Sequence, residues 1–304
     1  MIMINLKYHD EEFAVCEIEY SFLLNAKEKS KLVFFTQFLK DFNFKAIIID
    51  LSYAEVVDED VLNSFAQLLN SEKYIKLYHI KTLSMEIIKT FYDKSIDVIT
   101  PIENISFFDT YNFNNIIYEI NLFYEDYLYL RDVISEIETR YKNKNIIVSP
   151  KVNNDIDFKA YRMIIDYILK TSNNNISLNS FHLPTEIIKL HPCNVYLCTG
   201  HDCHIKKTNY PRYIEIDKNG NLHPYKIKYN QIRIGNLIDD EFDLYLVFSK
   251  YTNSIQHRQF LELNREVFKK INYLKFEIVP WRDMIEMEAR RRYDKDTSSE
   301  LYHK

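Results

Sequence analysis

Short apolar segments alternate with helical patterns along the first 180 residues of the chain. Residues 13–20 alternate apolar and polar side chains and predict a strand, and residues 46–51 form a β-branched apolar run typical of a buried strand. Residues 31–42 carry apolar side chains at helical spacing, and residues 58–70 open with acids, which suit a helix N-terminus. The pattern predicts further strands at 76–80, 97–100, 145–149 and 176–179, and helices at 85–94, 114–143 and 158–170.

This alternation of roughly six strands with helices favours an α/β fold with a parallel sheet or a partial barrel. The pattern changes near Pro184, where a cysteine-rich stretch is followed by short strands around 212–216 and 221–225. Helices are predicted at 252–273 and 281–293. We therefore divide the chain into residues 1–184, a small cysteine-rich segment at 185–245, and C-terminal helices with a polar tail at 246–304.

Glycine is scarce and clustered, which excludes several nucleotide-binding motifs. The chain has 3 glycines in 304 residues, Gly200, Gly220 and Gly235, all within one short stretch. A Walker loop, a Rossmann fingerprint or a kinase glycine loop needs several clustered glycines to let the backbone approach phosphate.

Charge and hydropathy narrow the class of protein further. The net charge of −5 argues against a general nucleic-acid binder, whose electrostatic footprint is basic. The first residues are too charged for a signal peptide, and no apolar run approaches the length of a membrane span. We expect a cytoplasmic protein that associates with neither nucleic acid nor membrane, and whose cysteines form no structural disulfides.

The densest group of chemically active side chains lies in HPCNVYLCTGHDCH, residues 191–204. Cys193, Cys198 and Cys203 alternate there with histidines that include His201 and His204. Thiolate and imidazole are the usual ligands of zinc, and thiolates alone hold iron–sulfur clusters, so these five side chains are our candidate metal ligands. In the alternative interpretation the cysteines are small buried hydrophobic residues and the histidines lie on the surface.

The stretch after this cluster resembles the SPASM or twitch extension of radical S-adenosylmethionine peptide maturases. Residues 214–225, IEIDKNGNLHPY, match the hairpin of that extension, and residues 235–237, GNL, match the turn that follows it. Cys198 and Gly200 stand near its first element. The resemblance thus implies that each of the three glycines sits in a turn that needs a positive φ. Tyr225 occupies the place of a cluster cysteine, which argues against an ordinary auxiliary iron–sulfur cluster.

The N-terminal half is similar to the partial (β/α)6 barrel of the same enzymes. After the first strand the family has C-x3-C-x2-C, whereas this chain has Cys16, Tyr20 and Leu23 in that register. Of the G-G-E-P motif that contacts the cosubstrate, only the acid is present, as Glu55. The resemblance implies a degenerate, or pseudo-, radical S-adenosylmethionine protein that does not cleave S-adenosylmethionine, because Tyr and Leu cannot ligate iron as thiolates do.

Three functions follow from these features. By resemblance, the first is an accessory protein in ribosomal peptide maturation that binds a precursor peptide, a catalytic maturase subunit, or both, and that holds Zn²⁺ or, less favoured, an iron–sulfur cluster. The second is a zinc-dependent hydrolase or lyase with an open ligand position, for which Glu55 could act as general base. The third is an interaction scaffold without metal, in which Glu55 is a solvated turn residue and the cysteines are replaceable.

Overall fold

The computed structural model describes residues 15–28, 31–42, 46–52, 54, 57–68, 72–77, 88–89, 91, 93, 96–110, 116–150, 176–179, 195–196, 213–224, 232–274 and 287–293. The chain forms two compact units, each made of two separate stretches. Unit 1 comprises residues 1–98 and 211–257, and unit 2 comprises residues 99–210 and 258–304. The predicted borders near residues 184 and 245 remain predictions.

Unit 1 contains a mixed sheet in the order β11-β10-β9-β1-β2-β3. β1 (Val15–Glu19), β2 (Ala46–Asp50) and β3 (Glu72–Lys76) are parallel, as the apolar β-branched runs predict. β9 (Tyr213–Ile216) adds to β1 in parallel, and β10 (Asn221–Pro224) and β11 (Gly235–Asn236) continue the sheet as antiparallel strands. Segments almost 200 residues apart in the sequence thus form one sheet.

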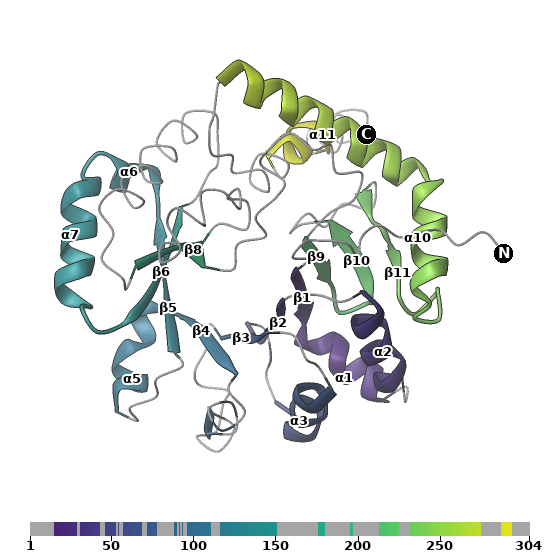
Figure 1. Ribbon diagram of the computed structural model, residues 1–304, viewed down its shortest axis with the longest axis horizontal. Helices are drawn as coiled ribbons and strands as arrows, with labels where there is room; N and C mark the ends of the chain where they lie inside the picture. The colour runs from purple at the N-terminus through teal and green to yellow at the C-terminus, as the bar shows by residue number, and fades with distance from the viewer. Residues whose placement is uncertain are drawn as a thin grey trace, which may run out of the picture. The chain divides into compact units, whose positions relative to one another are not determined.

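The helices of unit 1 are α1 (Tyr20–Glu28), α2 (Leu32–Phe42), α3 (Glu59–Leu68) and α10 (Leu244–Thr252). α1, α2 and α10 lie on the same side of β1, β9, β10 and β11 (Figure 1). The rings of Phe22, Phe35 and Phe242 pack together in this layer, with centroids 5.0 to 6.4 Å apart. The helix layer and the inner side chains of the sheet form the hydrophobic core of the unit.

The strands of unit 1 have one apolar face and one polar face. Cys16 and Ile18 of β1 lie level with Ile214 and Ile216 of β9, and all four are buried. Side chains alternate between the faces of a strand, so Glu17 and Glu215 stand on the opposite face. Glu17 and Glu215 are nevertheless buried, which is unusual for ionisable side chains. This face of the sheet is therefore a candidate for a functional site.

Unit 2 contains a parallel sheet of β5 (Ile116–Leu122), β6 (Asn145–Pro150), β7 (Ile176–Asn179) and β8 (Val195–Tyr196). β4 (Asp97–Pro101) contains the first boundary between the units. A 3-10 helix at Ile102–Asn104 and the helices α5 (Ile105–Asp109), α6 (Tyr124–Tyr127) and α7 (Leu130–Arg140) accompany these strands. α11 (Ile255–Leu274) begins just before the last boundary, and residues 287–293 are helical.

The fold is therefore mixed α/β with a parallel sheet and helices, as the alternation predicts. The described strands form no closed barrel. The strands predicted at 13–20, 46–51, 97–100, 145–149 and 176–179 and the helices predicted at 31–42 and 58–70 are confirmed, with small shifts of their ends. Residues 158–170 lie outside the described part of the chain.

Three element predictions need correction. The helix predicted at 114–143 instead begins with β5, because Ile116, Ile117 and Tyr118 are buried in succession and hide the alternation by which a strand is recognised. β3 begins four residues before the predicted strand, in the register that pairs Ile75 with Ile49. α10 was not predicted: it precedes α11, and Asn253 and Ser254 separate the two. No helix among the described residues is both long and apolar enough to cross a membrane.

Candidate functional site

The residues that the sequence nominates as ligands lie outside the described part of the chain. These are Cys193, Cys198, Cys203, His201 and His204, together with Glu55. Among the residues that the structure does describe, no three His, Cys, Asp or Glu side chains are placed to bind one metal ion. The metal-site prediction therefore stays a prediction.

The three positions that match the radical S-adenosylmethionine cysteine motif are core positions in unit 1. Cys16 lies inside β1, with no exposed surface, and burial together with the neighbouring Glu17 raises the pKa of its thiol. Tyr20 begins α1, and its hydroxyl accepts a hydrogen bond from the backbone N–H of Asp58 at 2.5 Å. Leu23 is buried on α1. These side chains fill the interior of the unit, so no loop at this place presents ligands to a cluster.

The hairpin of β9 and β10 is organised around one carboxylate, Asp217. Its Oδ1 accepts hydrogen bonds from the backbone N–H groups of Asn219 at 2.9 Å and Asn221 at 3.0 Å. Its Oδ2 accepts from the Asn221 side chain at 2.9 Å and lies 3.0 Å from Nε2 of His223. Burial by itself raises the pKa of Asp217, but these hydrogen bonds outweigh it and hold the pKa well below its usual range. The carboxylate is therefore ionised and fixes the turn.

Gly220 ends this turn with a φ of +80°, a conformation that L side chains rarely adopt. The predicted positive φ is confirmed at this glycine. A Cβ here would lie 2.9 Å from Cε2 of Phe22 on α1, so the turn is seated directly on the helix layer. The backbone of Lys218 adds two links to the same region, donating its N–H to Glu19 at 2.9 Å and accepting from the side chain of Asn25 at 3.3 Å.

The second glycine turn, at residues 235–237, is held by an amide network. Oδ1 of Asn221 accepts from Arg233 at 2.8 Å and from the side chain of Asn236 at 2.9 Å. Oδ1 of Asn236 in turn accepts from the backbone N–H groups of residues 238 and 239. Gly235 does not have a positive φ, so that part of the prediction is wrong. Close packing instead favours a residue without a side chain here, because a Cβ would lie 3.1 Å from Cγ1 of Val247, which would have to shift slightly.

A row of buried ionisable side chains crosses the polar face of unit 1. Glu17 of β1 is level with Glu215 of β9, and Glu215 is directly opposite His223 of β10. The His223 side chain is only 3% exposed, and its Nδ1 has no hydrogen-bond partner among the described residues. Because Nε2 faces the ionised Asp217, Nδ1 is the ring nitrogen that lacks a partner within the described part of the chain.

The sequence pattern alone does not single out this row of side chains. Glu215 and His223 lie within the match at residues 214–225 and Glu17 follows Cys16, but no role is assigned to any of the three from the sequence. A signal is present, because VCEIE and YIEI both place a glutamate between apolar residues, which puts the acid on the sheet face opposite the core. Buried acids beside a His–Asp pair can orient a polar group.

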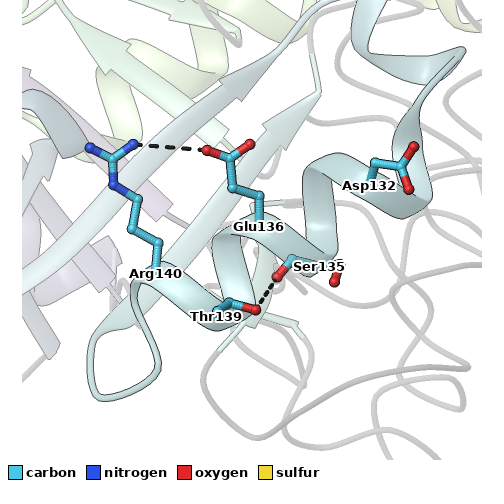
Figure 2. Close-up of a pocket in the computed structure, with 5 residues that line it drawn as sticks. All are labelled: Asp132, Ser135, Glu136, Thr139 and Arg140. Carbon is cyan, nitrogen blue, oxygen red and sulfur yellow. Dashed lines mark hydrogen bonds and ion pairs between the residues drawn. The ribbon is translucent and has the colours of Figure 1, made fainter.

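Unit 2 has a shallow hollow of about 390 Å³ along the exposed face of α7 (Figure 2). Its lining residues are Asp132, Ser135, Glu136, Thr139 and Arg140. Arg140 pairs with Glu136 at 3.9 Å, and Thr139 donates a hydrogen bond to the carbonyl of Ser135 at 2.8 Å (Figure 2). All five lie on one helix and none is buried, so the hollow has the character of a binding surface and not of a catalytic pocket.

Comparisons with family models, with curated proteins and with solved structures find no match to this chain.

Proposed function

We propose that this chain is an accessory protein in the maturation of a ribosomally made peptide. In this role it binds a precursor peptide, a catalytic maturase subunit, or both, and another chain supplies the radical chemistry. The proposal treats the fold as a degenerate partial (β/α)6 barrel that carries a SPASM- or twitch-like extension, and it places the protein in the cytoplasm.

The observation that carries the proposal is the contrast between the two halves of the resemblance. The hairpin from Tyr213 to Pro224 is formed, with its glycine turn seated on α1 and the turn at Gly235 paired beside it. The cysteine-motif positions of the N-terminal half are core residues, Cys16 and Leu23 among them. A scaffold that keeps the extension and fills the cluster position with packed side chains is suited to binding and orientation and not to reductive cleavage.

The metal in this proposal is Zn²⁺, with an iron–sulfur cluster as the less favoured choice. Cys193, Cys198 and Cys203 would supply thiolates, and His201 or His204 would supply the fourth ligand, which is a donor set that zinc prefers. Glu55 is the remnant of the cosubstrate motif, and S-adenosylmethionine is not expected to be cleaved.

The test is to co-express the chain with the short reading frames and any radical maturase gene that flank its own gene. We expect a stable complex with the peptide or the maturase by size-exclusion chromatography with light scattering. The purified chain alone, with S-adenosylmethionine and a strong reductant, should form no 5′-deoxyadenosine. Turnover by the chain alone, or a folded chain that binds neither partner, would overturn the proposal.

A further inference from the structure

Unit 2 exposes three large apolar side chains within seven residues, directly after β5. Phe123 is 51% exposed, Leu128 is 70% exposed and Tyr129 is 66% exposed. Backbone hydrogen bonds from Asp126 to Phe123 at 3.0 Å and from Tyr129 to Asp126 at 3.2 Å fold the intervening residues into a compact turn. The three side chains therefore belong to one small region of the surface, which we call the α6 patch.

These side chains are not needed for the core of the unit. The apolar face of α7 is supplied by Leu130, Ile134 and Ile137, which are buried, and the end of β5 by Leu122, which is also buried. The core therefore does not require the exposed side chains of the α6 patch to be apolar. A group of exposed aromatic and aliphatic side chains is typical of an interaction site.

The α6 patch continues into the hollow along α7. The backbone N–H of Asp132 donates to the carbonyl of Tyr129 at 2.9 Å, so the first lining residue of the hollow lies directly after the patch. Figure 2 shows Asp132 at one end of the hollow and the Glu136–Arg140 pair toward the other. An extended or helical segment seated on the patch can therefore continue along this shallow hollow on the exposed face of α7.

The charge of this surface indicates what it accepts. Exposed carboxylates stand at Glu125, Asp132 and Glu136, and the exposed cations of the same segment are Arg131 and Arg140. Arg140 is 3.9 Å from Glu136, and both side chains are about 70% exposed, so this ion pair is weak and easily exchanged. The surface is apolar at one end and carries three exposed carboxylates against two exposed arginines along its length, and this small excess of negative charge complements a cation-bearing apolar segment.

We propose that the α6 patch and the α7 hollow together bind a peptide segment that carries aliphatic or aromatic side chains at one end and Lys or Arg at the other. The inference rests on the proposed peptide-binding function and assigns its recognition surface and the chemistry of the bound segment. The apolar side chains anchor on Leu128 and Tyr129, and the cations lie beside Asp132 and Glu136.

The test uses a synthetic 15-residue peptide of Leu, Phe and Lys with a fluorescent label, and a second peptide with every Lys replaced by Glu. Fluorescence anisotropy at about 0.15 M salt measures binding. The double variant Leu128→Ala/Tyr129→Ala should weaken binding of the Lys peptide about tenfold or more, since the loss of one good anchor is commonly worth that factor. The matched control is Val33→Ala/Phe34→Ala, which removes equally exposed apolar side chains from unit 1 and should change binding less than twofold.

A second pair of variants tests the contribution of the carboxylates to peptide binding. Asp132→Asn/Glu136→Gln should weaken binding of the Lys peptide about threefold to tenfold and should reduce its salt dependence. Glu28→Gln/Glu103→Gln removes two exposed acids elsewhere and should leave binding unchanged. All variants alter surface side chains, and circular dichroism verifies that each is folded.

The outcomes separate this inference from the proposed function. The inference is overturned if the Lys peptide does not bind, if the Glu peptide binds as tightly, or if the Leu128 and Tyr129 variant binds like its control. Repeating the series with the precursor peptide encoded beside the gene makes the distinction: equal binding by parent and variant leaves the proposed function standing and removes this surface from it.

Discussion

Replacing Gly220 by alanine tests whether the hairpin is docked on α1 as described. The residue has a φ of +80°, and left-handed backbone costs a residue with a Cβ about 1–2 kcal/mol. The new Cβ would lie 2.9 Å from Cε2 of Phe22, whose buried ring is held edge-on by Phe35 with centroids 5.0 Å apart. Overpacking against a ring that cannot move adds about 1–3 kcal/mol. We therefore expect Gly220→Ala to destabilise the hairpin by about 2–5 kcal/mol.

Hydrogen exchange followed by mass spectrometry measures the loss of stability of the hairpin locally. Suitable probes are the backbone amide of Ile234, which donates to the carbonyl of Leu222, and that of Leu237, which donates to the carbonyl of Gly220. Asn219→Ala is the matched control: the side chain is exposed in the same turn and the backbone contact to Asp217 is kept, so the change should stay within about 0.5 kcal/mol. In a Phe22→Leu background the cost of Gly220→Ala should fall towards the backbone part of about 1–2 kcal/mol. A smaller steric part remains from Ile238, whose Cγ1 would lie 3.2 Å from the new Cβ. If these amides exchange no faster in Gly220→Ala than in the control, the hairpin is not docked on α1 as described.

Three further predictions follow from the ionisable and thiol groups. The pKa of Asp217 is lowered on folding, so its stabilising effect is complete above the unfolded value near ~3.9 and is lost as the pH falls below it. Asp217→Asn should therefore cost about 1.5–3 kcal/mol in urea unfolding at pH 7 and progressively less below about pH 4, and a cost that does not vary with pH would contradict the network. Cys16 is buried and the pKa of its thiol is raised, so iodoacetamide at pH 8 should label it only after unfolding, as peptide mass spectrometry would report; labelling of the native protein would place it elsewhere. Anaerobically purified protein should contain about one Zn²⁺ per chain, and the variant with Cys193, Cys198 and Cys203 changed to alanine should contain none; equal metal content in the two proteins would remove this site.

Much of the fold of unit 1 could be predicted because its strands carry strong local signals. The run AIIID is apolar and β-branched, and it forms β2 as expected. β5 was missed because its residues are buried on both faces, so no period separates it from a helix. The parallel pairing of β9 with β1 could not be predicted, because the local sequence of a strand does not indicate which distant strand will pair with it.

The candidate site was only partly accessible to sequence reasoning. The positive φ of Gly220 follows from its place in a tight hairpin turn. Glycine at 235 is favoured by close packing against Val247, a contact that the local pattern does not contain. Glu17, Glu215 and His223 become neighbours only through the register of β1, β9 and β10, which the sequence does not give. The exposure of Leu128 likewise depends on which side chains after β5 are buried in the core, and the sequence alone does not give this.

We propose that this chain binds and orients a peptide while another chain carries out the radical chemistry. The most direct test is mass spectrometry of the precursor peptide after incubation with the neighbouring maturase, with and without this chain. We expect the modified peptide to form at least tenfold faster when this chain is added, and we expect this chain alone to leave the peptide unchanged. An equal rate in its absence, or modification by this chain alone, would contradict this proposal.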